Sequence, residues 1–132
     1  MIDHAGRDSL TRAVQRYLDL MYDCDVSKFD TIFRPTAQLH GLRDGQLSMW
    51  PAAEYKDRLS KRASPKSIKA PREEEILLMD FASPTQALVK VRVRINSAVF
   101  VDYLTWHHVD GDWRITSKGY HNENGGDSMK PA

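Results

Sequence analysis

Several features that direct a chain to a particular class of protein are scarce in this sequence of 132 residues. It contains one cysteine, Cys24, so no disulfide framework can form, and an apolar helical setting favours a buried, inert thiol over a nucleophile. No apolar run approaches the roughly 20 residues that a membrane span needs, and the polar N-terminus lacks the apolar segment of a signal peptide. We therefore expect a soluble, cytoplasmic protein with no membrane partner.

The sequence also has no large excess of positive or negative charge. The chain carries 19 basic and 18 acidic residues, a net charge of +1, which gives no general attraction to nucleic acid. Residues 56–72 are basic, but no aromatic side chain is interleaved to stack bases, so a solvated surface is favoured over a phosphate or nucleic-acid patch. The sequence also lacks a Gly-rich phosphate loop, paired metal-binding cysteines and a nucleophile elbow, and we expect no cofactor.

Hydrophobic patterning, in contrast, is clear and predicts three helices, over residues 9–24, 25–33 and about 51–62. In the first helix, apolar residues recur at helical spacing, so one face turns to a core. Asp25 can cap the second helix and Pro35 stops it. Pro51 suits the first turn of the third helix.

The rest of the chain is predicted to form β-strands. Asp44-Gly45 stands between two short apolar runs, which is a hairpin signal, and residues 63–72 form a loop. Four strand-like runs follow, and tight turns separate them at residues 83–84, 96–97 and 110–111. This order predicts an α+β domain over residues 1–121, in which three helices pack on a curved antiparallel sheet to form a cone. The polar tail, residues 122–132, is predicted to be disordered.

The stretch HHVDGDWRI, residues 107–115, packs two histidines and two aspartates together and raises the question of a metal site. Asp110-Gly111 is a favoured two-residue hairpin turn, which fixes how the two flanking strands pair. Because side chains alternate along a strand, His107 and His108 then lie on opposite faces and cannot bind one ion. We therefore predict a hairpin here and no metal site.

Extending this pairing predicts which side chains face the core. One face collects the largely apolar residues Phe100, Leu104, Trp106, His108, Trp113 and Ile115, and is therefore the buried face. The same face also collects Asp102, Ser117, Gly119 and His121, all at the end far from the turn. A polar cluster at one end of an apolar face is typical of a ligand pocket; the alternative is a sheet end that meets water.

Three segments, residues 14–41, 52–59 and 100–121, resemble the nuclear transport factor 2-like superfamily, and they are closest to its lumazine-binding branch. The resemblance covers nearly the whole domain and implies a cone-shaped, cystatin-like fold. It also implies a homodimer contact on the outer face of the sheet, where Lys90, Arg92 and Arg94 point. Function stays open, because this fold hosts isomerases, dehydratases, binding modules and dimerisation domains.

The chain also resembles ketosteroid isomerase, a member of the same superfamily. The resemblance implies an oxyanion-hole tyrosine at Tyr17 and a neutral aspartic acid at Asp102, the arrangement known from that enzyme. The general base of that enzyme would fall near Gly41, which cannot take a proton, and this argues against the same reaction. The neighbouring His40 is a candidate base only if a bulge turns its side chain inward.

Two functions from different classes are therefore open. In the first, the domain binds a small hydrophobic or aromatic ligand and acts as a cofactor-independent isomerase or dehydratase. The ligand contacts are then Tyr17, Trp106, Ser117 and His121, and the catalytic groups are Asp102, Tyr17 and His40. In the second, the domain is a non-catalytic homodimeric association or ligand-carrier module. Tyr17 also fits a packed core position, and His121 a strand end. Because no cation is expected on its face, we expect desolvation to raise the pKa of Asp102.

Overall fold

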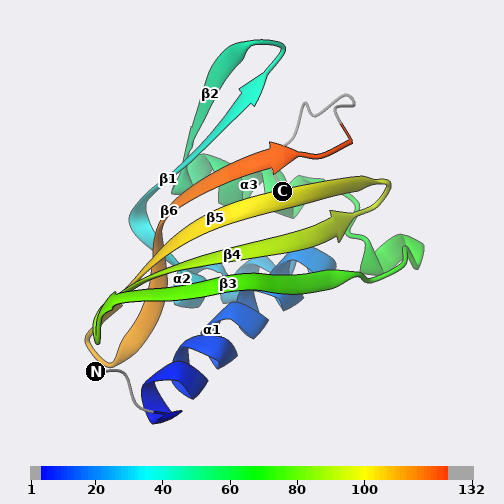
Figure 1. The fold of residues 1–132 in the computed structure, drawn as a ribbon. Helices are drawn as coiled ribbons and strands as arrows, with labels where there is room; N and C mark the ends of the chain where they lie inside the picture. The colour runs from blue at the N-terminus through cyan, green and yellow to red at the C-terminus, as the bar shows by residue number, and fades with distance from the viewer. Residues whose placement is uncertain (1–3, 125–132) are drawn as a thin grey trace.

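The computed structural model of the protein describes residues 4–124 (Figure 1). Its helical segments are α1 (His4–Asp23), the 3-10 turn η1 (Val26–Lys28), α2 (Phe29–Ile32), α3 (Ala52–Lys61) and the 3-10 turn η2 (Lys66–Ile68). Its strands are β1 (Phe33–Arg43), β2 (Gln46–Pro51), β3 (Glu74–Ser83), β4 (Gln86–Ile95), β5 (Ala98–Val109) and β6 (Asp112–Asn122). None of these helices combines the length and apolar character that crossing a membrane requires.

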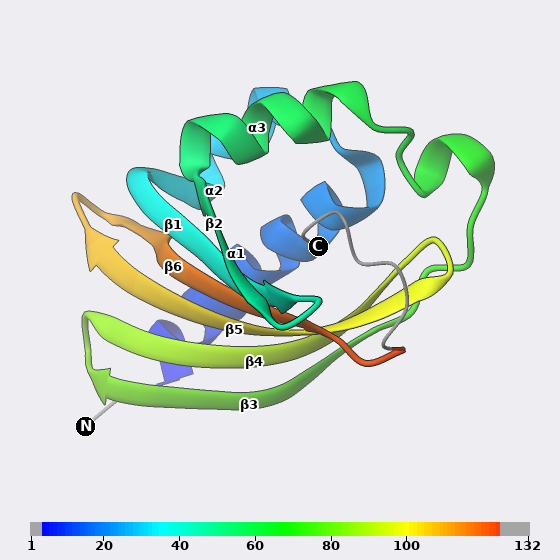
Figure 2. The ribbon, with the colours of Figure 1, turned by 90° about the horizontal axis from the view of Figure 1, so that it is seen from above.

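The six strands form one sheet in the order β2-β1-β6-β5-β4-β3. All neighbours are antiparallel except β1 and β6, which run parallel and join the N-terminal hairpin to the last strand. The sheet is strongly curved, and the helices lie on its concave side (Figure 2). The predicted α+β cone is therefore confirmed.

The helix boundaries differ from the prediction in ways that local chemistry explains. α1 begins at His4, five positions before the predicted start. Asp25 caps as predicted, since its carboxylate accepts a hydrogen bond of 3.1 Å from the backbone nitrogen of Ser27. The second helix ends at Ile32, and Pro35 lies inside β1, in the stretch where the pairing with β6 is irregular and a missing N–H costs little.

The predicted hairpin turns are confirmed by their backbone angles. Asp44 and Gly45 have φ values of 50° and 78°, and Asp110 and Gly111 have values of 55° and 85°. Two successive positive φ angles define the primed turn that matches the twist of the flanking strands.

The predicted tail begins inside β6 at Asn122, and its residues 125–132 lie outside the described part of the chain.

A β-bulge at Thr116 breaks the alternation of side chains along β6. Up to Ile115, which pairs with Trp106, the strand pairs with β5 as predicted. The next pair is Ser117 with Thr105, so Thr116 is the extra residue that faces no partner of its own. Its hydroxyl lies 2.7 Å from Nδ1 of His107, which holds the bulge in place.

The bulge overturns the predicted inner face beyond Ile115. Ser117 and His121 are exposed, and the residues that turn inward instead are Lys118 and Tyr120. The prediction that Ser117 and His121 share a face with Asp102 is therefore wrong, because regular alternation was assumed where the strand carries one additional residue.

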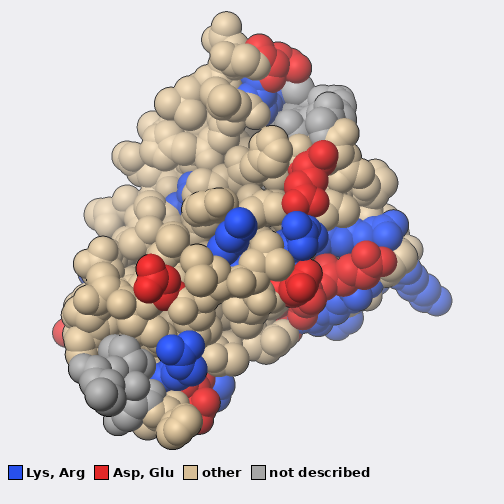
Figure 3. Space-filling view, viewed as in Figure 1, with Lys and Arg blue, Asp and Glu red and all other residues tan. Residues whose placement is uncertain are grey.

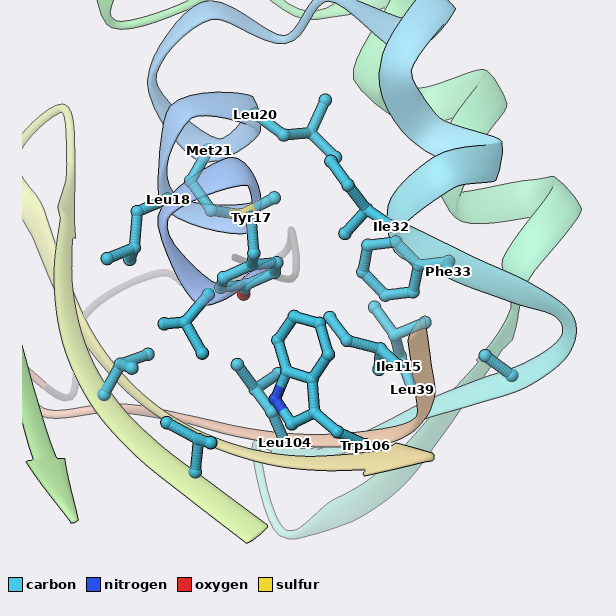
Figure 4. Packing of buried hydrophobic residues seen from close by; sticks show 14 of the residues in the cluster. Tyr17, Leu18, Leu20, Met21, Ile32, Phe33, Leu39, Leu104, Trp106 and Ile115 are labelled. Atoms are coloured by element: carbon cyan, nitrogen blue, oxygen red, sulfur yellow. The ribbon is translucent and has the colours of Figure 1, made fainter. Parts of the chain in front are cut away.

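The core fills the space between the concave face and the helices. Tyr17 from α1 points toward Leu104 and Trp106 from β5, and the ring of Phe33 from β1 lies on one side of them (Figure 4). The rings of Phe29 and Phe33 stack with centroids 4.6 Å apart. The predicted apolar inner positions of β5 and β6 are buried, apart from the half-buried His108.

The outer face of the sheet carries neighbouring charges of opposite sign (Figure 3). Arg92 forms ion pairs with Glu75 and Glu123, and Arg94 pairs with Glu73. Lys90, Arg92 and Arg94 therefore point away from the core, as predicted, and the two arginines have acidic partners.

Candidate functional site

The interior of the cone holds two ionisable side chains that meet across β5 and β6. Asp102 and Lys118 are both fully buried, and Lys118 Nζ lies 3.9 Å from Asp102 Oδ2. They come from neighbouring strands, because Asp102 pairs with Tyr120 and the bulge turns Lys118 to the same face. The expectation that Asp102 faces no cation is therefore wrong.

Two tyrosine hydroxyls from the helices complete the cluster. Tyr17 of α1 donates a hydrogen bond of 2.5 Å to Asp102 Oδ2. Lys118 Nζ donates one of 3.2 Å to the hydroxyl of Tyr55, which belongs to α3. The ammonium group also lies over both rings, 5.1 Å from the centroid of Tyr17 and 4.8 Å from that of Tyr55. We call Tyr17, Tyr55, Asp102 and Lys118 the buried cluster.

One oxygen of the cluster has no partner. Asp102 Oδ2 accepts the bond from Tyr17, whereas Oδ1 is buried and has no hydrogen-bond partner among the described residues. A buried carboxyl oxygen in this state has lost water without replacement, which is costly in a structural role and useful in a site that receives a ligand. Oδ1 is therefore the atom of the cluster that is open to further chemistry.

Burial dominates the ionisation of Asp102. Desolvation raises its pKa, and the opposing effects of Lys118 and of the hydrogen bond from Tyr17 are smaller. The direction and its main cause agree with the sequence-based expectation, although the cation was not foreseen. A carboxyl in this setting binds a proton far more readily than one at the surface.

Burial acts on Lys118 in the opposite sense. Desolvation lowers the pKa of its ammonium group to about 8, and the attraction of Asp102 offsets only part of this effect. Desolvation likewise raises the pKa of both Tyr17 and Tyr55, so both hydroxyls remain proton donors. Burial thus acts against the charged form of both Asp102 and Lys118, and it makes the neutral pair, an amine beside a carboxylic acid, easier to reach than it is for the same groups in water. Such a pair can move one proton between its members without changing its net charge.

Gly41, where the ketosteroid isomerase resemblance would place a general base, lies against an aromatic ring. A Cβ atom built on Gly41 would stand 2.4 Å from Cε2 of Tyr120. The bulge therefore brings Tyr120 into the space that a side chain at position 41 would occupy. The chain has no carboxylate at this place, and the buried cluster is assembled without one.

The remaining predicted site residues are dispersed. Trp106 lies in the core, fully buried, with an indole Nε1 that has no hydrogen-bond partner among the described residues. His40 lies between the buried Leu39 and Gly41 on β1, and its side chain points to the outer face, so the bulge that would have redirected it inward is absent from its strand segment. Of the predicted catalytic groups, Tyr17 and Asp102 are brought together, and His40 is not.

Lys118 and Tyr55 were missed at the sequence level for different reasons. Tyr55 has helical spacing with Ala52 and Leu59, and nothing in that pattern distinguishes it from a packed core residue. Regular alternation along the strand would place Lys118 on the outer face, and lysine is rarely buried. The one available signal was the change of apolar positions along β6, from Trp113 and Ile115 to Tyr120, which indicates a shift in register.

Metal ligands do not converge in the part of the chain that the structure describes. His107 and His108 lie on opposite faces, as predicted, and the second contacts the ring of Trp113. No three histidine, cysteine, aspartate or glutamate side chains gather among residues 4–124 in a way that could hold an ion.

Sequence comparison identifies a family and a named relative. The family described as "Putative lumazine-binding" matches residues 5–121. A protein from Cladobotryum sp named "Aldolase FrzH" is 26% identical over 116 residues, which cover 86% of this chain and 89% of that protein.

Solved structures share the fold. An NTF2-like protein of unknown function from Silicibacter pomeroyi DSS-3 superposes with a TM-score of 0.82 at 23% identity, over 93% of this chain and all of that one. A ketosteroid isomerase-like protein from Erwinia carotovora atroseptica has a TM-score of 0.67 at 12% identity, over 88% of this chain and 95% of that one. At these identities the similarity establishes the fold alone.

Proposed function

The chain belongs to the family described as "Putative lumazine-binding", within the NTF2-like superfamily, and from this premise we propose that its cone binds a small carbonyl compound and removes a proton next to the carbonyl group. The family description supports a ligand-binding domain. The observation that carries the chemical step is the buried cluster, in which an acid with one unpartnered oxygen faces an amine and two phenols.

Removal of a proton next to a carbonyl is common to several reactions. An isomerase returns the proton elsewhere, a dehydratase expels a hydroxyl group, and an aldolase joins the resulting carbanion to an aldehyde. The relative named as an aldolase supports this class of chemistry. Each reaction needs a base for the proton and a positive or hydrogen-bonding group for the carbonyl oxygen.

The cluster supplies both requirements. The carboxylate form of Asp102 takes the proton on Oδ1, and burial strengthens it as a base because its pKa is raised. Lys118 and Tyr55 lie within 3.2 Å of each other and provide donors for the substrate oxygen. Tyr17 holds Oδ2, which orients the carboxyl group. Because the cluster has no exposed surface, substrate enters only when the packing of α1 and α3 over it opens.

The proposal is tested by proton exchange. A panel of small ketones and aldehydes in D₂O is followed by NMR, and we expect deuterium to enter beside the carbonyl group. Asp102→Ala should lower the exchange rate at least about 100-fold, the usual size of a general-base contribution. Arg92→Ala, on the outer face, is the matched control and should leave the rate unchanged. A panel that shows no exchange above buffer would contradict the proposal.

A second candidate function, association between two copies, is favoured by the outer face. Leu78, Lys90 and Tyr103 pair in a row across β3, β4 and β5, and the row continues through Gly119 and His40 to Met49. Leu78, Tyr103 and Met49 are each about half exposed, so this row presents apolar surface without a cover in the described chain. Sedimentation should give about twice 15.1 kDa, and Tyr103→Glu should give the monomer. A wild-type monomer would contradict this candidate.

A further inference from the structure

We propose that Lys118 is a covalent catalytic residue whose amine forms an imine with the carbonyl carbon of an aldehyde or ketone substrate. This inference rests on the proposed function and deepens it, because it names how the carbonyl group is held. In the proposed function, Lys118 need only donate a hydrogen bond; here its nitrogen bonds to carbon. The two versions differ in what can be trapped chemically.

The surroundings of Lys118 favour a nucleophile over a fixed cation. The nitrogen is fully buried and lies 3.2 Å from the Tyr55 hydroxyl, 3.9 Å from Asp102 Oδ2 and 4.0 Å from Met21 Sδ. A close, charge-assisted hydrogen bond would bring the ammonium nitrogen and the carboxylate oxygen to about 2.8 Å, and here the two atoms are 3.9 Å apart. The lowered pKa of about 8 is consistent with this geometry, since a useful share of the amine is then neutral near physiological pH.

The neutral pair supplies every proton that imine formation needs. The lone pair of Lys118 Nζ adds to the carbonyl carbon, and the carbonyl oxygen takes the proton of the Asp102 carboxylic acid. One proton then passes from the nitrogen through Asp102 to the new hydroxyl group, which leaves as water. The products are an iminium ion, water and the Asp102 carboxylate, so one neutral pair has become one ion pair with atoms and charge conserved.

The same carboxylate then performs the next step. The iminium ion makes the neighbouring carbon acidic, and Asp102 Oδ1, which has no other partner, removes its proton. The electron pair of the broken C–H bond forms the C=C bond of an enamine, and the positive charge on nitrogen is neutralised. The enamine carbon then adds to an aldehyde whose oxygen takes the proton from Asp102, which restores the iminium ion and the carboxylate. Hydrolysis of the iminium ion by water releases the aldol product and returns Lys118 and Asp102 to their starting forms.

Reductive trapping tests the covalent step. The full chain is incubated with dihydroxyacetone, acetone or cyclohexanone as probes, and sodium borohydride is added to reduce any imine to a stable amine. Peptide mapping by mass spectrometry then locates the adduct. We expect Lys118 to be modified at least about 10-fold faster than any exposed lysine, and Asp102→Asn to lower this rate, because an amide cannot supply the acid. Lys66→Met, in the exposed 3-10 turn η2, is the control and should leave trapping at Lys118 unchanged.

Lys118→Met should abolish both the adduct and the exchange of protons beside the carbonyl group. Because peptide mapping reads the wild-type chain, the test stands even where this variant does not fold. Adducts spread equally over the exposed lysines would overturn the inference. Proton exchange without an adduct on Lys118 would overturn it as well while leaving the proposed function in place, and the absence of both would remove both.

Discussion

The inner surface of the β5–β6 hairpin has two halves that differ sharply in chemistry. Between the Asp110-Gly111 turn and the bulge, its inward side chains are large and apolar, with Trp106 and Ile115 fully buried. Beyond the bulge, the apolar Leu104 and Phe100 share the inner face with Asp102, Lys118 and Tyr120, which are also buried, yet ionisable or hydroxyl-bearing. Both halves lie in the same two strands and face the same helices.

The comparison teaches that burial alone does not make the second half a core. Aromatic and aliphatic side chains gain from leaving water, whereas a carboxyl and an amine lose solvation that only their mutual contacts replace. Here those contacts are incomplete, since Asp102 Oδ1 is unpartnered and the ion pair is long. An arrangement that costs stability and persists in the centre of a fold is most simply explained by chemistry that the fold performs.

Shifting the inner face beyond the bulge should break the difference between the halves most completely. Insertion of one alanine between Ser117 and Lys118 moves every later side chain of β6 to the opposite face, so Lys118 and Tyr120 turn outward and His121 turns inward. We expect the free energy of unfolding to fall by about 4 kcal/mol or more, because a buried tyrosine is lost and Asp102 is left buried without its cation. Urea unfolding followed by circular dichroism measures this. Thr116→Ala, which keeps the residue count, should cost only about 1 kcal/mol, and equal losses in both variants would contradict this account of the inner face.

Breaking the pair within the polar half should have the next largest effect. Lys118→Met leaves Asp102 buried without its cation, and we expect a loss of about 3 kcal/mol at pH 7. The loss should shrink at pH 5, where Asp102 takes up a proton more readily because its pKa is raised. The double variant Asp102→Asn, Lys118→Met should regain most of the loss. Urea titrations of Lys118→Met, Asp102→Asn and the double variant measure these losses. A loss in the double variant equal to the sum of the two single losses would contradict this account.

The pH dependence of stability should reveal the buried amine directly. The pKa of Lys118 is about 8 in the fold and ordinarily 10.5, so the folded state binds fewer protons than the unfolded state between these values. Stability contributed by this group therefore rises with pH across that window, and the cost of burying the charge is fully present below pH 8. Relative to Lys118→Met, the wild type should gain up to about 3 kcal/mol between pH 8 and 10.5. If the difference in stability between the wild type and Lys118→Met did not change with pH, Lys118 would be in contact with solvent.

Filling the space beside Tyr120 should have a smaller effect. Gly41→Ala places a Cβ atom against the Tyr120 ring, and we expect a loss of about 2 kcal/mol as the ring is displaced. Gly119→Ala is the matched control, because its new Cβ atom would lie 3.9 Å from Cβ of Tyr103, an ordinary van der Waals contact. Thermal unfolding of the two variants should separate them clearly. Equal melting temperatures would indicate that Tyr120 moves aside without cost.

Changes on the outer face should be smallest of all. Arg92 is exposed and its ion pairs with Glu75 and Glu123 are screened by water and salt. We expect Arg92→Ala to leave the urea midpoint unchanged within error at physiological salt. A marked loss there would show that the outer charges, and not only the interior, hold the sheet together.

Much of the fold could be predicted from the sequence because its signals are local. Helical spacing defined α1, and the Asp-Gly turns defined the hairpins and their pairing near the turn. The parallel contact of β1 with β6 could not be predicted, because it joins distant parts of the chain and leaves no local pattern. Within the site, Tyr17 and Asp102 were identified through the family resemblance and the inner face of β5.

The position of Lys118 in the site could not be predicted, because it depends on the one extra residue that the bulge adds to β6. Thr116 has no feature that marks a bulge in sequence, since threonine suits a regular strand equally well. Regular alternation without the bulge predicts Ser117 and His121 on the inner face and places Lys118 on the outer one. Side chains alternate with a period of two, so one extra residue exchanged every assignment beyond it.

The contact between Gly41 and Tyr120 constrains the order in which this chain could change. An acidic residue introduced at position 41 would collide with the phenol ring, so the aromatic residue at position 120 would have to become smaller first. The opposite order passes through an intermediate that is destabilised before it has gained anything. A chain that gains a carboxylate at position 41 would therefore have to change position 120, on β6, first. A chain that loses such a carboxylate would change position 120 last.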